Sequence, residues 1–205
     1  VMMTQMINNS AESGGAVFVN KLFLLETYNV TYILNHAKLQ GNSVVILNVY
    51  KSVKMKCIFQ LNSGSTIYST QSNYIHYCTC TFFSNKGSAV KVKMGGVLFI
   101  QMCTFQHNLG VKAGGIHVER YRSIYLERII FMHNSAYSIE YEHAGGIYVY
   151  SCKVLAIKET NFISSKLRQM MLGFGGGIKL KRVFRFSLQN STFYDNKARH
   201  GGGIY

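Results

Sequence analysis

Short runs of alternating apolar and polar residues follow one another along the whole chain. Around residue 116 the pattern is clear: Ile116–Val118 alternates, Tyr121–Leu126 is a second apolar run, and Ile129–Phe131 begins a third. Alternation with a period of two predicts half-buried β-strands. Since no segment carries a capped apolar stripe of helical spacing, we expect an all-β chain with three short strands in each repeat.

One sequence unit recurs at intervals of 23 to 31 residues. In Cys103–Val118 the aromatic Phe105 is followed three residues later by Asn108, and then by a Gly-Gly pair and Ile116. The first position of the unit falls at Met6, Tyr32, Phe59, Phe82, Phe105, Phe131, Phe162 and Phe193. A period in this range indicates a stacked repeat architecture, here a parallel β-helix of about eight coils. We predict one domain over residues 1–205, and we expect it to be a piece of a longer protein.

Stacking gives each repeated residue a physical role. The aromatic points inward and stacks on its copy one coil away. The Asn three residues later lies where the strand turns, tolerates the left-handed region, and bonds to the next Asn through its amide. The sites are Asn9, Asn35, Asn62, Asn85, Asn108, Asn134, Ser165 and Asn196, with the serine breaking the series.

The Gly-Gly pair and the aliphatic residue after it complete the predicted interior. Two glycines allow unusual backbone angles or close contact between coils. The aliphatic ladder is Ala16, Val44, Ile67, Val90, Ile116, Ile147, Ile178 and Ile204. Proline is absent from the chain, which suits strands that pair on both sides.

Three of the five cysteines fit the same scheme. Cys57, Cys80 and Cys103 each lie two residues before the aromatic, in three consecutive coils, and form a predicted inward thiol ladder. Copies ~4.8 Å apart are too distant for a relaxed disulfide, so we interpret them as small buried hydrophobes. Cys78 and Cys152 lie off this ladder, and the cysteine spacing matches no metal site.

The tandem Phe-x-x-Asn and Gly-Gly-Ile motifs resemble the repeats of the chlamydial polymorphic outer-membrane proteins. They are also similar to right-handed β-helix repeats of the pectin-lyase-like superfamily in surface or secreted proteins. The resemblance covers essentially the whole chain. It implies a right-handed parallel β-helix with an adhesive or passenger-type role, extracellular or at the cell surface.

The charge is strongly unbalanced. Lys and Arg number 22 against 8 Asp and Glu, for a net charge of +14. A basic surface favours an anionic partner, such as acidic glycan, nucleic acid or lipid headgroups. Alternatively, the cations keep a long stack soluble and unpaired at its edges. Because nucleic-acid binding rests on charge alone, we do not expect it.

The acidic residues offer little for catalysis. Glycoside hydrolysis needs two carboxylates across one bond, and calcium-dependent lyases need several acidic ligands on one face. The chain has a single aspartate, Asp195, and its one acidic cluster is Glu140, Glu142 and His143, which a solvated loop explains as well. We predict no catalytic site, metal or cofactor. The runner-up hypothesis is a polysaccharide lyase or hydrolase of the pectin-lyase-like type.

Two long loops are the first candidate for ligand binding. Residues 135–144 and 166–174 occupy the same turn on adjacent coils, so we expect them to project side by side. Their candidate contacts are Tyr137, Tyr141, Lys166 and Arg168. Tyrosine with basic side chains suits acidic glycan, although variable loops without a ligand would look the same.

An outward-facing ladder is the second candidate. It follows the aliphatic position in every coil: Val17, Val45, Tyr68, Lys91, His117, Tyr148, Lys179 and Tyr205. From Tyr68 onward every member is aromatic or basic, and we select Lys91, His117, Tyr148 and Lys179 as binding residues. A hydrated sheet face is the alternative, because tyrosine has a high β-propensity.

These patterns favour a structural or adhesive protein without enzymatic activity. Its expected partners are acidic glycans or surface proteins. We expect contact with a membrane only through other parts of a longer chain.

Overall fold

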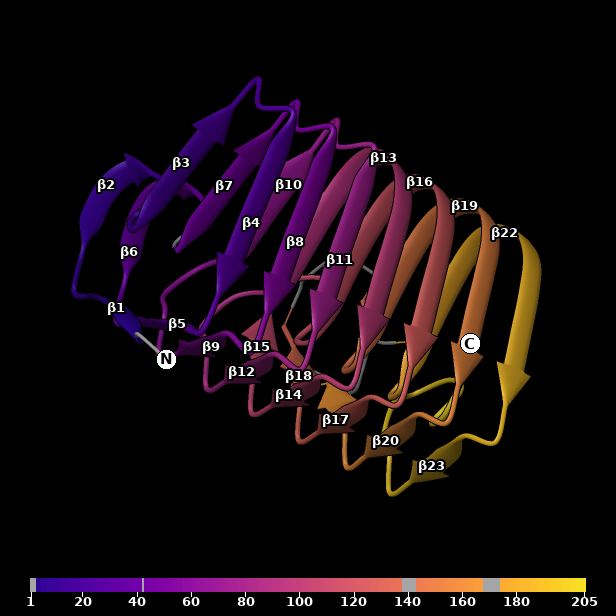
Figure 1. The fold of residues 1–205 in the computed structure, drawn as a ribbon. Helices are drawn as coiled ribbons and strands as arrows, with labels where there is room; N and C mark the ends of the chain where they lie inside the picture. The colour runs from indigo at the N-terminus through magenta and orange to yellow at the C-terminus, as the bar shows by residue number, and fades with distance from the viewer. Residues whose placement is uncertain (1–2, 42, 138–142, 168–173) are drawn as a thin grey trace.

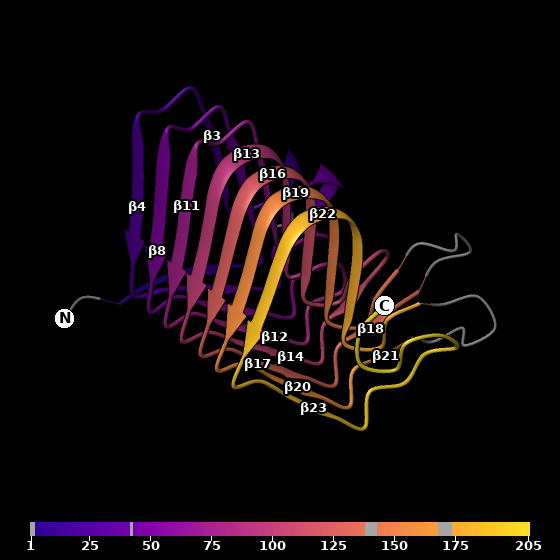
Figure 2. The same ribbon diagram turned by 90° about the vertical axis from the view of Figure 1, so that its right-hand side faces the viewer.

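The chain winds into a stack of similar coils. The computed structural model describes residues 3–41, 43–137, 143–167 and 174–205. Its strands pair in parallel with their copies one coil earlier and later, and the two termini lie at opposite ends of the stack (Figure 1, Figure 2). The predicted all-β parallel β-helix is therefore confirmed. In the part of the chain that the structure describes, no helix is long and apolar enough to cross a membrane.

Four parallel sheets run along this stack. The first contains β1 (Thr4–Ile7), β5 (Val30–Ile33), β9 (Ile58–Gln60), β12 (Thr81–Phe83), β14 (Thr104–Gln106), β17 (Ile130–Met132), β20 (Asn161–Ile163) and β23 (Thr192–Tyr194). The second contains β3 (Val17–Asn20), β4 (Leu24–Tyr28), β7 (Val44–Leu47), β8 (Lys51–Met55), β10 (Ile67–Thr70), β11 (Tyr74–Cys78), β13 (Val90–Gln101), β16 (Ile116–Glu127), β19 (Ile147–Lys158) and β22 (Ile178–Gln189). The two small sheets are β2 (Ser10–Ser13) with β6 (His36–Gln40), and β15 (Leu109–Gly110) with β18 (Ser135–Ala136) and β21 (Lys166–Leu167).

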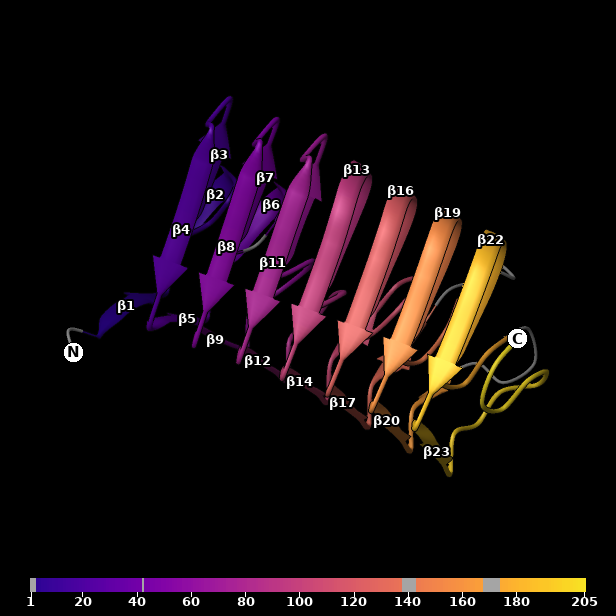
Figure 3. The same cartoon turned by 45° about the vertical axis from the view of Figure 1, so that its right-hand side comes forward.

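The prediction of three short strands per coil is only partly right. In the early coils the second sheet receives two separate strands, such as β7 and β8. From residue 90 onward the two runs merge into one strand of 12 residues, as Figure 3 shows for β13, β16, β19 and β22. Each long strand bends at one non-glycine residue of positive φ. These residues are Met94, Arg120, Ser151 and Arg182.

The aromatic ladder forms the centre of the core. Successive rings from Tyr32 to Phe193 stack with centroids 4.6 to 4.9 Å apart and with their planes within 12° of parallel. Rings in such an arrangement add ~0.5–1.5 kcal/mol per pair beyond the area they bury. The stacked rings are Tyr32, Phe59, Phe82, Phe105, Phe131, Phe162 and Phe193.

The asparagines form a ladder beside these rings that runs from Asn9 to Asn134. The amide of Asn35 donates to Asn62 over 3.2 Å, and that of Asn108 donates to Asn134 over 3.0 Å. The expected left-handed backbone at the asparagine is wrong, because the residue of positive φ is the one before it, as at His107 (φ 55°). That residue turns the chain, and the asparagine follows with its side chain inward. Asn196 also joins the ladder, since its Oδ1 accepts the backbone N–H of Ser165.

Close contact between coils explains the later Gly-Gly pairs, whereas Gly14 of the first pair has a positive φ of 64°. Gly115 and Gly146 do not have positive φ, but a Cβ on Gly146 would lie 2.6 Å from the carbonyl oxygen of Gly177. The position predicted for the first coil is wrong by one residue, because Val17 pairs with Val44. Val17 therefore takes the aliphatic position predicted for Ala16.

The thiols lie inside the stack in adjacent coils. Cys57, Cys80 and Cys103 are buried and free, and the backbone N–H of Cys80 donates to the Cys103 sulfur over 3.3 Å. Cys78 and Cys152 are also buried and free. The hydrogen bond to the thiol of the next coil, and then burial, raises the pKa of both Cys57 and Cys80, which keeps them uncharged.

Candidate functional site

The bends of the three last long strands create a basic surface groove. Its concavity has a volume of about 990 Å³ and lies across β16, β19 and β22. We call it the arginine trough and define it by its five cationic side chains, all exposed: Arg120, Arg122, Lys153, Arg182 and Arg185. None of the described residues that line the trough is acidic. Five cations therefore share a surface without a counter-ion among the lining residues.

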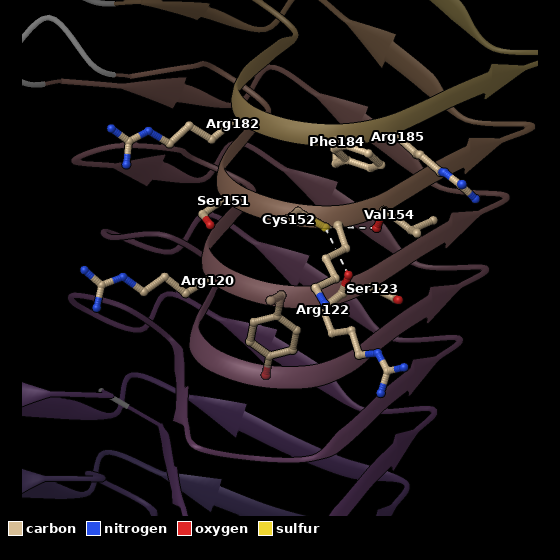
Figure 4. A pocket seen from close by; sticks show the side chains of 11 residues that line it. Arg120, Arg122, Ser123, Ser151, Cys152, Val154, Arg182, Phe184 and Arg185 are labelled. Atoms are coloured by element: carbon tan, nitrogen blue, oxygen red, sulfur yellow. Dashed lines mark hydrogen bonds between the residues drawn. The ribbon is translucent and has the colours of Figure 1, made fainter.

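The coil register brings these side chains together. Arg120, Ser151 and Arg182 occupy the same bend position in successive coils and project on one side, while Arg122 and Arg185 project on the other (Figure 4). Arg120 lies two coil spacings from Arg182, and Arg122 lies two coil spacings from Arg185, which is roughly 10 Å in each case. Arg182 donates to the Tyr150 hydroxyl over 2.9 Å and lies over its ring. This contact fixes one guanidinium at the rim.

A notch of two glycines adjoins the trough on the side of the earlier coils. Gly95 and Gly96 line a second concavity of about 340 Å³, to which Arg120 also contributes. A Cβ on Gly95 would lie 2.3 Å from the Tyr121 ring, so this position needs glycine for close approach. The notch and the trough lie in adjacent coils at the same bend, and Arg120 belongs to both.

A second basic site is a pocket of about 380 Å³ at the turns that lead into β13 and β16. We call it the lysine pocket and define it by Lys86, Lys91, Lys93, Lys112, His117 and Glu119. Gly64 and Gly87 form part of its wall, and a Cβ on Gly87 would collide with the Gly64 backbone. Glycine at position 87 therefore allows the two turns to approach each other closely.

Glu119 is the one carboxylate among the described residues that line the lysine pocket. Glu119 accepts from Lys93 over 2.8 Å and contacts the His117 ring nitrogen over 2.8 Å. The bonds from His117 and Lys93 hold the pKa of Glu119 well below its usual range, so it stays ionised. Burial, then the positive charge of Lys93, lowers the pKa of Lys91. Burial also lowers the pKa of His117, so the imidazole is neutral near pH 7.

The structure separates the eight residues predicted to bind a ligand. Lys91, His117 and Tyr137 meet in the lysine pocket, from the outward ladder and from the first long loop. Tyr148 and Lys179 are buried, and Lys166 is exposed on β21. Tyr141 and Arg168 lie outside the described residues.

The expectation of a fully outward ladder is wrong because the turns fold back over it. Ala113 and Ala144 form a bridge between coils and pack with Tyr148, while the Phe174 ring lies 4.4 Å from the Lys179 ammonium. His117 is only 4% exposed. The bases of the long loops do lie side by side, since Ser135–Ala136 pairs with Lys166–Leu167.

The carboxylates of the later coils are engaged by cations. Glu159 accepts from Arg128 over 2.8 Å and lies 3.2 Å from Lys158, while Asp195 lies 2.9 Å from Lys197. Glu140 and Glu142 of the predicted acidic cluster lie outside the described residues, and their neighbour His143 is buried. Among the described residues, no group of three or more His, Cys, Asp or Glu could hold a metal ion.

The repeat contains a sequence signal that predicts the arginine trough. Arg120 and Arg182 each lie four residues after the aliphatic position, at Ile116 and Ile178. Their shared offset places them in one column. The outward ladder predicted from the sequence includes only the residue next to each aliphatic position. It therefore missed the column at the bend.

Comparison with known proteins gives one positive result. No curated protein and no solved structure shows significant similarity to this chain. The model of a family described as "Right handed beta helix region" matches residues 16–205, which is most of the chain. The repeat register and the parallel sheets agree with that match. The chain therefore belongs to the right-handed β-helix family.

Proposed function

We propose that this β-helix is a non-enzymatic adhesive segment that binds acidic glycans through the arginine trough. The observation that carries the proposal is the clustering of five exposed cations over three adjacent coils, with no acidic residue lining the groove. Arginine is always charged, and its planar fork binds carboxylate and sulfate groups in a bidentate manner. A repeated coil spacing presents these forks as a regular array to a repeating polymer.

The shape of the trough also suits a polysaccharide. Phe184 lies in the groove and is 83% exposed, so its ring is available for contact with the apolar face of a sugar. Because the bend positions repeat along the stack, we expect the polymer to lie along the helix axis. The similarity of the repeats to chlamydial outer-membrane and pectin-lyase-like proteins adds support for an extracellular or cell-surface location, where such glycans occur.

The runner-up is a carbohydrate-active enzyme of the pectin-lyase-like type. The observation in its favour is the His117–Glu119 pair in the lysine pocket. A general acid needs a raised carboxyl pKa, whereas the pKa of Glu119 is strongly lowered. A carboxylate held between His117 and Lys93 serves charge balance better than proton transfer.

A binding experiment with matched variants tests the proposal. The trough variant carries Arg120→Ser, Arg122→Ser and Arg185→Ser, and the control removes three exposed cations elsewhere through Lys21→Ser, Lys38→Ser and Lys51→Ser. Binding to immobilised heparin and polygalacturonate is measured at about 0.1 M and about 1 M salt, because screening shortens from ~10 Å to ~3 Å between them. Dextran serves as the neutral polymer.

We expect wild type and control to bind both acidic polymers at low salt, and the trough variant to lose most of this binding. Equal losses in the two variants would show that net charge alone drives binding and would contradict the proposal. If duplex DNA competes equally well with the acidic polysaccharides, the trough binds polyanions in general and has no preference for glycans. Shortening of polygalacturonate during the assay would favour the enzyme.

A further inference from the structure

We infer that the arginine trough selects acidic glycans with a disaccharide repeat, in which charged and uncharged sugar residues alternate. This inference rests on the proposed function, because it concerns the same groove and the same class of ligand. It is carried by the order in which cations and uncharged residues follow one another from coil to coil. The spacing of the anionic groups along the glycan is then a second criterion for binding, in addition to its total charge.

The cations of the trough are unevenly distributed over its three coils. Strand β16 contributes two arginines, Arg120 and Arg122, and strand β22 contributes two more, Arg182 and Arg185. In each pair the two side chains project on opposite sides of the groove (Figure 4). Strand β19 lies between them and contributes a single cation, Lys153. The trough thus has two arginine pairs, which are separated by a coil with less positive charge.

Ser151 interrupts a row of arginines at the bend. It lies between Arg120 and Arg182, and the three residues share a left-handed backbone with φ of 61°, 57° and 58°, respectively. Since both neighbouring coils accommodate arginine, the backbone does not require serine here. Repulsion between adjacent cations does not require it either, because Arg122 and Lys153 are neighbours two residues further along their strands. The missing charge at Ser151 instead matches an uncharged group on the ligand.

The distance between the arginine pairs matches two sugar residues. Ordinary bond lengths of ~1.5 Å make one 1,4-linked sugar residue of an extended chain roughly 5 Å long, which is close to one coil spacing. In these coils the stacked rings of Phe131, Phe162 and Phe193 lie 4.9 and 4.7 Å apart. A glycan along the stack therefore places one sugar residue on each coil. The outer two of three residues meet the arginine pairs, and the middle one meets Ser151.

The middle coil offers the contacts that an uncharged sugar residue needs. The Ser151 hydroxyl can donate and accept hydrogen bonds with the hydroxyl or acetamido groups of a sugar. Val154 also lines the groove at this coil and provides an apolar contact. A carboxylate at this position would meet only one cation, Lys153, whereas each outer coil offers two guanidinium groups. Charged sugar residues therefore bind preferentially at the outer coils.

Two acidic oligosaccharides with equal charge and different charge spacing test the inference. One is a 1,4-linked octasaccharide in which glucuronate and N-acetylglucosamine alternate, and the other is tetragalacturonate, so each carries four carboxylates. Calorimetric titration at about 0.1 M salt, where screening extends over ~10 Å, measures both affinities. Maltooctaose, which is uncharged, measures the contribution of chain length and should bind only weakly. We expect wild type to bind the alternating octasaccharide several times more tightly than tetragalacturonate.

Ser151→Arg should change this preference. The substitution completes the row with Arg120 and Arg182, so tetragalacturonate should bind about five times more tightly, the upper value of an exposed ion pair, and the octasaccharide should change much less. Thr192→Arg, at an exposed position of β23 in another sheet, adds the same charge away from the trough and should change both affinities little. An equal gain for the two oligosaccharides in Ser151→Arg would show that the trough responds to charge alone and would overturn the inference.

Lys153→Ser provides a test that does not depend on the folding of Ser151→Arg. It removes the one cation that β19 contributes to the trough, so it should weaken tetragalacturonate more strongly than the octasaccharide. Equal weakening, or wild type that binds tetragalacturonate as tightly as the octasaccharide, would overturn the inference. If heparin and tetragalacturonate bind and the octasaccharide does not, the inference is wrong while the proposed function stands. If none of the three binds to wild type, the proposed function itself is wrong.

Discussion

The side-chain amide of Asn85 donates a hydrogen bond of 2.9 Å to Oδ1 of Asn108, one coil further along the stack. The same oxygen accepts the backbone N–H of Asn85 over 3.1 Å. Asn108 repeats the arrangement toward Asn134 and also donates to the carbonyl oxygen of Phe82. Each asparagine thus satisfies buried backbone groups in its neighbours.

We expect Asn108→Ala to lower the free energy of unfolding by roughly 2–4 kcal/mol. The substitution leaves the buried Asn85 N–H and Phe82 carbonyl without partners, and each orphaned group costs about 1–3 kcal/mol. Urea denaturation followed by circular dichroism measures the loss. A change below about 0.5 kcal/mol would contradict this role for the ladder.

Ser165→Asn should have the opposite effect. Serine interrupts the ladder here, and its buried hydroxyl has no hydrogen-bond partner among the residues that the structure describes. An asparagine can bond to both Asn134 and Asn196, so we expect a gain of about 1 kcal/mol. Thermal melting of this single variant checks the sign. Ser187→Asn, at an exposed position of β22 outside the ladder, is the control and should leave the melting temperature nearly unchanged.

A buried lysine inside the stack supplies the third prediction. Lys54 is fully buried, and its ammonium donates to Thr27 over 3.2 Å. Burial lowers its pKa to about 8, opposed by the nearby Cys57 and Cys80 thiols. Lys54→Met preserves the shape of the side chain and removes its charge. We therefore expect the free energy of unfolding of this variant at pH 7 to exceed that of wild type by roughly 2–3 kcal/mol.

The advantage of Lys54→Met should shrink as pH rises. The unfolded chain keeps this proton up to its ordinary pKa of 10.5, whereas the folded chain releases it near 8. Between these values the unfolded state binds more protons, so wild type gains stability with pH. The thiols and tyrosines around Lys54 titrate in both proteins and cancel in the difference. Urea denaturation at several pH values from 7 to 9 measures the difference in free energy of unfolding between Lys54→Met and wild type. A difference that stays constant would show that Lys54 does not titrate in this range.

A pair of glycine variants tests close contact between coils. A Cβ on Gly146 would lie 2.6 Å from the Gly177 carbonyl oxygen, whereas one on Gly203 would meet only ordinary contacts at 3.5 Å or more. We expect Gly146→Ala to destabilise the protein by about 1–3 kcal/mol and Gly203→Ala to be nearly neutral. Equal melting temperatures for the two variants would remove this explanation of the Gly-Gly motif.

The three Asn-x-Ser/Thr sequons have a backbone explanation. Asn8, Asn29 and Asn190 have φ values of 54°, 54° and 47°, and asparagine is enriched in this left-handed region. Asn29 and Asn190 turn the chain before strands β5 and β23, where threonine is common. The sequons therefore fit the coil geometry whether or not the sites carry glycan.

The interior of this protein follows from its repeat pattern. Inward positions must match their copies one coil away, so the spacing from Phe105 to Asn108 recurs along the chain, and an aliphatic residue such as Ile116 follows at a variable distance. The outside carries no such constraint. Alternation predicts that His117 and Tyr148 leave the inner face, but it does not predict what covers them, and the turns from Ala113 and Ala144 do so.

The places where the basic residues meet follow from the folded stack. Arg122 and Arg185 are distant in sequence, and the coil register places them in one trough. The lysine pocket joins Lys91 on β13 to Lys112 in a turn of the next coil. The trough depends on three strands of equal length that bend at the same position, whereas the lysine pocket depends on turns whose lengths vary from coil to coil. A repeat pattern specifies the interior of a solenoid because neighbouring coils pack there, while a site such as the lysine pocket depends on how individual turns fold back.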